Sequence, residues 1–477
     1  MTGQIVRLES ILLILPFIVA VIYGEVMCGV AFMVTAAISF LLGTMMARCS
    51  RPESKVIYAP EGFIITALSW VVLSLIGALP FVFSGDIPSY TDAFFETVSG
   101  FTTTGASILY DVEALSHAAL FWRSFTHWIG GMGVLVLIIA IMPSSSARSI
   151  HILRAEVPGP TMGKLVPKLR STSMILYLIY SALTVLLVIL LIAGGMPVFD
   201  SILHAFGTAG TGGFGIKADS VASYSPYSQW VIAIFMLIFG VNFNIYYLIL
   251  IRKVKSVIHS HELWTYLGIV ATSVILITAN IASRFSNVFE ALRHSAFQVS
   301  SIITTTGFSS ADFDLWPDFS KNILFLLMFI GGCAGSTAGG IKVSRIVIMF
   351  KQIKRSFSSM LHPRSVGIIR MDEKSVDNAT LHNVNVYFIL YMTCLAIIIL
   401  LLGLEQFSFE TNFTAAVACF NNIGPGFASV GPAYSYAGYS VFGKWLLSLT
   451  MLLGRLEIYP IILATQLFFT RKKYKKT

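Results

Sequence analysis

The chain has 477 residues, of which 56% are hydrophobic and only 12% are charged. A soluble protein of this length would carry far more charge, so the composition excludes a soluble globular protein and indicates an integral membrane protein. The net charge of +9 does not indicate nucleic acid binding, because the cations are concentrated in alternate loops between apolar stretches.

Apolar stretches long enough to cross a membrane recur along the whole chain. A helix needs about 20 residues to cross a hydrocarbon core of about 30 Å. Ten such stretches are predicted near residues 8–24, 28–48, 60–83, 118–142, 173–195, 228–251, 263–282, 322–341, 385–404 and 442–469. The first leads into a second span without a cleavage site, which indicates a retained helix rather than a signal peptide. The sequence therefore predicts an all-α polytopic membrane protein.

The loops between these spans differ in charge. Most Lys and Arg residues lie in the loops after the second, fourth, sixth and eighth spans and in the tail. The positive-inside rule places these loops and both termini in the cytoplasm. The opposite loops carry acids such as Asp111, Asp219 and Asp312, which would concentrate cations at a pore mouth. A solvated acidic rim without function explains the same acids equally well.

Four short amphipathic segments lie between the spans, and each begins with an acid: Asp92, Asp200, Glu290 or Glu410. Since the number of spans is even and the termini are cytoplasmic, each segment must enter from outside and return outside. A helix of roughly ten residues descends about 15 Å, half of the hydrocarbon thickness. The acid is predicted to cap the amides and to complement the positive end of this half-helix.

Each half-helix is followed by a hairpin rich in threonine, asparagine and glycine. The hairpins are at 102–105, 211–214, 304–308 and 421–424. Polar backbone is tolerated at membrane depth only where it is buried in protein or lines a water-filled path. An ordinary loop explains any single hairpin, whereas four at intervals of about a hundred residues predict one shared pore. Their carbonyls could replace the hydration shell of a monovalent cation, and glycine permits the required dihedral angles.

One further pattern overlaps the second hairpin. Residues 210–215 satisfy the G-x-G-x-x-G pattern of dinucleotide-binding folds. No buried strand precedes the pattern and no βαβ unit surrounds it, so we expect this chain to bind no nucleotide.

Several longer motifs identify a family. They are TDAFFETVSGFTTTGAS at 91–107, HWIGGMG at 127–133, RAEVPGP at 154–160, IGGCAGSTAGGIKV at 330–343, FNNIGPGF at 420–427 and GRLE at 454–457. Together they resemble the Trk/Ktr/HKT superfamily of cation transporters, most closely the bacterial Trk potassium-uptake membrane subunits, and the resemblance extends over nearly the whole chain. The resemblance implies four fused helix/pore-helix/helix repeats around a pseudo-fourfold pore, a homodimer, and a cytosolic nucleotide-binding regulatory subunit. It also implies a multi-pass protein of the bacterial inner membrane.

The resemblance divides the chain into five parts. They are two N-terminal helices (1–50), repeat 1 with its hairpin (51–150), repeat 2 (151–258), repeat 3 with a gating loop and a cytoplasmic loop (259–380), and repeat 4 with a basic tail (381–477).

The resemblance also assigns potassium contacts, residue by residue. They fall on Thr103, Thr104, Gly105, Thr211, Gly212, Gly213, Thr305, Thr306, Gly307, Asn422, Ile423 and Gly424. The register of repeat 2 is open between Gly210 and Gly213, and the Gly-Phe ending favours Gly213. Glycine at all four filter positions goes with potassium preference in this family. The alternative within transport is a sodium or sodium/potassium symporter.

The inner span of repeat 3 contains a run of glycines. The candidate gate residues in it are Gly331, Gly332, Gly335, Ser336, Thr337, Gly339 and Gly340. Each glycine costs about 1 kcal/mol against alanine inside a helix, so the run predicts an irregular loop beneath the hairpins. Close helix packing of the G-x-x-x-G kind through Gly331 and Gly335 is the alternative.

Arg455 lies near the centre of the last predicted span. A charge at that depth costs about 3 kcal/mol and marks a functional residue by default. We predict that Arg455 faces the pore and forms a barrier together with the glycine run. The alternative is a buried pair that holds helices together. Glu457, two residues later, is expected to point elsewhere.

The basic loops at 143–172 and 342–380 suit lipid headgroups and partner docking about equally. An enzyme is not expected, since His117, His127, His204 and His294 are scattered near outer ends of segments without metal-ligand spacing. A scaffold or receptor would have no use for four such hairpins. The sequence thus predicts potassium uptake through a selective pore.

Overall fold

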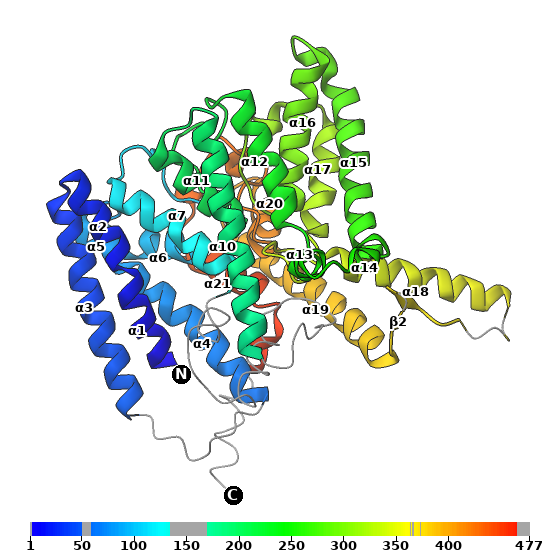
Figure 1. Cartoon of the computed structure of the whole chain (residues 1–477), viewed down its shortest axis with the longest axis horizontal. Helices are drawn as coiled ribbons and strands as arrows, with labels where there is room; N and C mark the ends of the chain where they lie inside the picture. Colours follow the sequence, from blue (N-terminus) through cyan, green and yellow to red (C-terminus); the bar gives the residue numbers. More distant parts are fainter. Residues whose placement is uncertain are drawn as a thin grey trace, which may run out of the picture.

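The computed structural model describes residues 2–49, 59–133, 169–362, 364, 367–372 and 374–464. In this part of the chain the regular structure is helical apart from one two-stranded hairpin (Figure 1). The predicted all-α class is therefore confirmed.

Six helical segments are long and apolar enough to cross a membrane in the part of the chain that is described. They are Thr2–Tyr23, Val26–Cys49, Glu61–Ser84, Ser171–Ala193, His261–Arg284 and Asn378–Leu402. The helices that form them are α1 (Thr2–Leu12), α2 (Ile14–Tyr23), α3 (Val26–Cys49), α4 (Ala59–Gly77), α5 (Leu79–Ser84), α10 (Leu169–Ala193), α15 (His261–Ile281), η1 (Ala282–Arg284) and α19 (Asn378–Leu402). These six coincide with six of the ten predicted spans.

The other four predicted spans are the inner helices of the repeats, and they are short. They are α7 (His117–Gly131), α12 (Pro226–Phe239), α17 (Asp318–Ile330) and α21 (Val441–Arg455). With 13 to 15 residues each, they reach about 20 Å, less than the hydrocarbon thickness. The stretch predicted as a span at 228–251 is bent, because α12 and α13 (Phe243–Leu250) meet at an angle of 89°. Parts of the spans predicted at 118–142 and 442–469 lie outside the described residues.

The inner helices end near glycines that touch neighbouring backbone. A Cβ on Gly130 would overlap the carbonyl of Phe101, and a Cβ on Gly454 would overlap that of Phe420. Gly240 follows α12 directly, and its own Cβ would meet the side chain of Thr304. Three of the four breaks therefore lie against residues at the ends of pore helices, whereas Gly331 at the end of α17 meets the backbone of Gly339.

The four half-helices predicted from the sequence are α6 (Tyr90–Phe101), α11 (Val198–Gly210), α16 (Val288–Ile303) and α20 (Phe409–Phe420). Ser89, Asn287 and Ser408 cap three of them, each accepting an amide hydrogen bond from the third helical residue. The prediction that the acids themselves are the caps is wrong, since these acids lie within the first turn. They still complement the positive end of each helix dipole.

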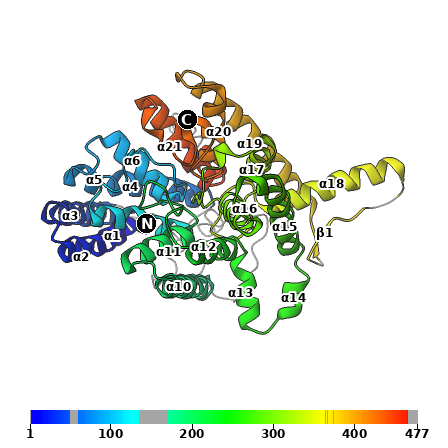
Figure 2. The same cartoon turned by 90° about the horizontal axis from the view of Figure 1, so that it is seen from above.

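The four repeats close into a ring. Within a repeat, the outer helix packs on the pore helix and the pore helix packs on the inner helix. Each inner helix also packs on the pore helix of the next repeat, in the pairs α7–α11, α12–α16, α17–α20 and α21–α6. The last pair joins repeat 4 to repeat 1, and the view from above shows the pore helices around a common centre (Figure 2).

The remaining elements lie at the periphery or in loops. They are α14 (Val254–Ile258), α18 (Val343–Leu361), β1 (Arg370–Met371), β2 (Lys374–Ser375), η2 (Phe313–Leu315), η3 (Ala428–Val430) and η4 (Tyr436–Gly438). The strands β1 and β2 pair antiparallel, with Arg370 opposite Ser375. Helix α18 projects away from the bundle (Figure 1).

Candidate ion pathway

The four hairpins share one backbone conformation. Each has a left-handed residue after the pore helix and a glycine with positive φ two residues later. The pairs are Thr103 (φ 56°) and Gly105 (80°), Thr211 (55°) and Gly213 (71°), Thr305 (56°) and Gly307 (86°), and Asn422 (55°) and Gly424 (97°). A β-branched residue is rarely found there, and such strain gathers at functional sites. We call the segments 102–105, 210–213, 304–307 and 421–424 the filter hairpins.

This conformation sets the register of repeat 2. Gly213 has the backbone of Gly105, whereas Gly210 is the last residue of α11. The two-residue spacing from the left-handed threonine to the glycine is the same in all four repeats, so Gly213 is the structural equivalent of Gly105.

One hydrogen bond recurs behind each hairpin. The amides of Thr104, Gly212, Thr306 and Ile423 donate to the carbonyl oxygens of Ser99, Gly207, Ser301 and Ala418, over 2.8 to 2.9 Å. This is the Schellman arrangement, in which a left-handed residue turns the chain back on the helix end. The amides of the hairpins are thereby occupied on the helix side.

Neighbouring hairpins touch backbone to backbone in a closed cycle. A Cβ on Gly105 would overlap the carbonyl oxygen of Gly212, and one on Gly213 would overlap that of Thr306. In the same way Gly307 meets the carbonyl of Ile423, and Gly424 meets that of Thr104. The ring therefore requires glycine at each of these positions, for space as well as for φ.

The hairpin carbonyls are left without hydrogen bonds. Among the described residues, nothing donates to the carbonyls at 103, 104, 211, 212, 305, 306, 422 and 423. The carbonyl of Gly424 differs, since the hydroxyl of Tyr436 donates to it over 2.7 Å. Buried carbonyls are almost always paired, so eight unpaired ones around one centre form a site that can replace the water of a cation.

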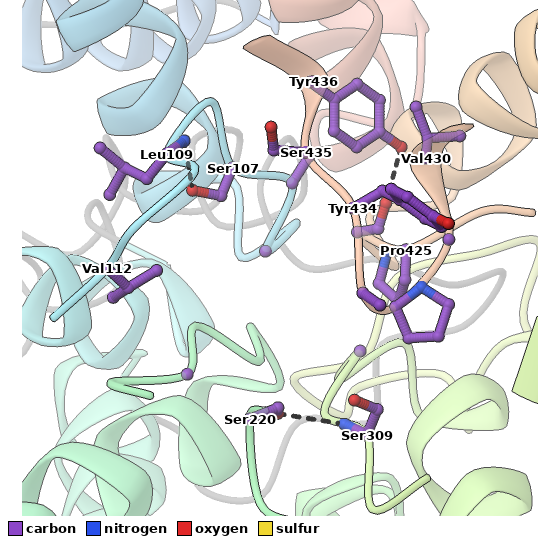
Figure 3. Close-up of a pocket in the computed structure, with 18 of the residues that line it drawn as sticks. Ser107, Leu109, Val112, Ser220, Ser309, Pro425, Val430, Tyr434, Ser435 and Tyr436 are labelled. Carbon is purple, nitrogen blue, oxygen red and sulfur yellow. Dashed lines mark hydrogen bonds between the residues drawn. The ribbon is translucent and has the colours of Figure 1, made fainter. Parts of the chain in front are cut away.

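A cavity of about 330 Å³ lies over the filter hairpins and is lined by all four glycines. Its walls come from the segments that follow each hairpin. Ser107, Ser220, Ser309 and Tyr436 belong to four different repeats and face it from different sides (Figure 3).

A buried ion pair braces this cavity, and sequence reasoning missed it. Arg123 Nε lies 2.6 Å from Glu96 Oε1, and Arg123 is 3% exposed. The guanidinium also donates to the carbonyl of Gly215 over 2.7 Å and stacks 3.6 Å from the ring centre of Phe214. Glu96 in turn accepts from the amide of Ile108. The pair thus ties repeat 1 to repeat 2. In the sequence, the only indication of this pair was the acid Glu96 within the pore-helix motif.

At the rim, the Tyr224 hydroxyl donates to Asp200 Oδ2 over 2.7 Å. Burial and this bond raise the pKa of Tyr224 above its usual value. The acid that opens α11 is therefore engaged in the fold of the rim.

The glycine run forms an irregular loop, residues 331–342, between α17 and α18. We call it the glycine loop. Gly339 N donates to Thr305 Oγ1 over 2.6 Å, so the loop touches a filter hairpin directly. The predicted loop is present, and the alternative of helix packing through Gly331 and Gly335 is wrong, because these residues are not helical.

Arg455 joins the glycine loop to α7. Its guanidinium donates to the carbonyls of Thr337 (2.8 Å), Gly130 (2.5 Å) and Gly131 (2.7 Å). Glu457 points elsewhere, as predicted, and accepts from Arg345 of α18 over 2.6 and 2.9 Å. The two charges therefore hold different elements.

A second acid at the glycine loop was not predicted. Glu262 Oε1, at the start of α15, accepts from the amides of Ala334 (2.7 Å) and Ser344 (3.1 Å). Glu262 is 8% exposed. One carboxylate thus closes the glycine loop near both of its ends; the only sequence signal was an acid at the start of a span.

One histidine is placed differently from the prediction. His127 does not lie at an outer end but beside Gly212, fully buried. Among the described residues, no group of three or more His, Cys, Asp or Glu side chains could hold a metal.

A ring of re-entrant helices and hairpins around unpaired carbonyls defines a polytopic membrane protein of the ion-transporting class. The chain belongs to the TrkH family of cation transport proteins, which it matches over residues 28–476. The family resemblance is thereby confirmed.

Its relatives include the Trk system potassium uptake protein TrkH of Salmonella typhimurium, 38% identical over 472 residues that cover 96% of each chain. The Trk system potassium uptake protein TrkG of Escherichia coli is 35% identical and covers 99% of this chain and 98% of its own. The crystal structure of the potassium transporter TrkH from Vibrio parahaemolyticus superposes with a TM-score of 0.86 at 31% identity, over 96% of both chains.

Proposed function

We propose that this chain takes up potassium across a cell membrane, with the filter hairpins as its selectivity filter. The ion contacts are assigned to Thr103, Thr104, Gly105, Thr211, Gly212, Gly213, Thr305, Thr306, Gly307, Asn422, Ile423 and Gly424. The observation that carries the proposal is the ring of unpaired carbonyls at equivalent positions of four repeats. Such a ring replaces the hydration shell of a monovalent cation.

Two points favour potassium over sodium. The relatives are named as potassium uptake proteins, and every repeat carries glycine at the filter position. A sodium or sodium/potassium symporter of the same superfamily is the second candidate, because the pore is built in the same way.

The glycine loop and Arg455 are proposed as the gate. The loop lies against Thr305 of the filter, and Arg455 ties its Thr337 to the end of α7. A path through the centre of the ring would pass this loop, so its displacement would open the path. The amide hydrogen bonds to Glu262 would have to loosen at the same time.

We further propose that the chain works as a homodimer with a cytosolic nucleotide-binding regulatory subunit, in the bacterial inner membrane with both termini cytoplasmic. The relatives named as parts of a Trk system support a complex, and the basic stretch around α18 offers it a docking surface or a lipid contact. Because α18 follows the glycine loop directly, a partner that moves α18 would move the gate.

Ion flux through the purified protein in liposomes tests the function. Wild-type protein should carry rubidium, a potassium substitute, in preference to sodium. Gly105→Ser should lower this preference, because the ring leaves no room for a Cβ at that position. Gly268→Ala is the matched control, since Gly268 of α15 has open space around its Cβ position. Equal preference in wild type and Gly105→Ser would refute the filter assignment, and sodium flux alone would favour the symporter.

A further inference from the structure

Repeat 2 lacks side chains behind its filter hairpin. In repeat 1 the hydroxyls of Thr102 and Thr104 are 2.7 Å apart, and in repeat 3 those of Thr304 and Thr306 are 2.8 Å apart. Each pair links the first and third residues of its hairpin. Repeat 2 has glycine at both positions, Gly210 and Gly212. Repeat 4 has Asn421 and Ile423 there. The hairpin of repeat 2, with no side chain at either position, would therefore be the loosest of the four.

A residue of α7 fills the vacant space. A Cβ on Gly212 would overlap the imidazole ring of His127, and a Cβ on Gly210 would overlap the backbone carbonyl of the same residue. His127 is fully buried. Its ring stacks on Phe214, directly after the hairpin, with the centroids 4.2 Å apart and the planes at 21°. His127 therefore packs against repeat 2 on both sides of the filter glycine.

His127 contacts the hairpin of repeat 2 by van der Waals packing and not by hydrogen bonds. Among the described residues neither ring nitrogen of His127 has a hydrogen-bond partner. Gly212 does not have positive φ, so the backbone conformation at this position permits a side chain. The equivalent positions of repeats 1 and 3 carry Thr104 and Thr306. The side chain that three repeats supply within the hairpin is thus supplied to repeat 2 from a neighbouring helix.

We propose that His127 is a positioning residue for ion selectivity, which stands in for the missing side chain of Gly212 and holds the carbonyls of repeat 2 in the ring. This inference rests on the proposed function, because selectivity can be measured only if the protein conducts. It adds a residue that neither the filter nor the gate contains.

A size series at position 127 tests the role. His127→Ala leaves a cavity behind Gly212, and we expect the rubidium-to-sodium flux ratio to fall by about tenfold. His127→Phe keeps an aromatic ring of similar size and should stay within about twofold of wild type. A ratio unchanged in His127→Ala, or equally low in both variants, would overturn the proposal.

A rescue experiment gives a second test that does not depend on His127→Ala alone. Gly212→Thr should abolish flux, because the new side chain meets the imidazole. The double variant Gly212→Thr/His127→Ala makes room for a threonine like those of repeats 1 and 3, and flux should rise at least about tenfold over Gly212→Thr.

The matched control is Gly210→Ala with His127→Ala. The Cβ at Gly210 meets the backbone carbonyl of His127, which the substitution leaves in place, so this pair should not recover. Recovery of the Gly210 pair, or none of the Gly212 pair, contradicts the proposal. Wild-type protein without selective rubidium flux would instead refute the proposed function.

Discussion

The filter and the level directly beneath it are built on different rules. At the filter, four hairpins repeat one backbone, with the same left-handed residues and the same hydrogen bond to the pore helix. Beneath it, in the part of the chain that the structure describes, the inner helices end differently: α12 turns sharply into α13, whereas α17 is followed by the long glycine loop. Coordination of a small ion needs equivalent oxygens from all sides, whereas one segment is enough to obstruct a path.

The difference follows from what touches each level. A Cβ on each filter glycine would meet the hairpin backbone of the next repeat, so a change in one hairpin would disturb the next. The glycine loop, by contrast, contacts several dissimilar elements. Gly339 N donates to the filter residue Thr305, Phe243 N donates to the carbonyl of Gly335, and Arg455 donates to that of Thr337. The four repeats must therefore be equivalent at the filter hairpins, whereas they differ at the level of the glycine loop.

The largest expected effect comes from breaking the equivalence of the filter. Gly213→Ala places a Cβ against the carbonyl of Thr306 at a φ of 71°, and we expect rubidium uptake to fall by about 100-fold. Uptake into liposomes measures it, with Gly268→Ala as the control. Because the ring is symmetric, Gly307→Ala should have the same effect; a mild result in either would show that the repeats are not equivalent.

The next effect concerns the gate. Arg455→Ala removes three hydrogen bonds to carbonyls, each of a kind worth about 1.5–3 kcal/mol. If these bonds hold the glycine loop in the path, basal rubidium flux should rise by about tenfold with selectivity unchanged. Lys253→Ala, at an exposed cation after α13, should have no effect. Unchanged flux in Arg455→Ala would remove this residue from the gate.

A smaller rise in basal rubidium flux is expected from a change at Glu262, which also holds the glycine loop. Glu262→Ala removes the acceptor of the Ala334 and Ser344 amides, and basal flux should increase by about threefold. Both amides donate to the same oxygen, so Glu262→Gln, which keeps an oxygen there, should stay closer to wild type. The idea fails if the two variants conduct equally.

The smallest effect is expected at the rim. Lys444 Nζ lies 2.6 Å from Asp92 Oδ1, with 12% and 24% of the side chains exposed. Lys444→Ala should lower thermal stability by no more than about 1 kcal/mol and leave ion preference unchanged. A loss of selectivity here would mean that the acidic rim, and not only the filter, discriminates between cations.

Much of the fold could be predicted because it depends on local sequence. Long apolar runs gave six of the spans, and the Thr/Gly hairpins gave the four re-entrant segments. The breaks of α7, α12 and α21 were not predicted. Gly130 and Gly454 stand within apolar stretches that read as continuous spans, and only the structure shows their contact with the backbone of Phe101 and Phe420 at the pore-helix ends.

The candidate site divides in the same way. Threonine and glycine at a fixed spacing indicated the filter, and a charge in an apolar run indicated Arg455. The contacts of Glu96, Glu262 and His127 were not predicted, because each contacts residues distant in sequence: Arg123, the glycine loop, and Gly212.

The sequence by itself determined that this is a membrane protein with four pore-like repeats, since hydropathy and glycine placement are local properties that survive without knowledge of neighbours. Only the tertiary structure decided which residues meet across repeats. It paired Gly213 with Thr306, closed repeat 4 on repeat 1, and seated His127 behind Gly212. Contacts between distant segments depend on the packing of the whole ring, which no stretch of sequence encodes alone.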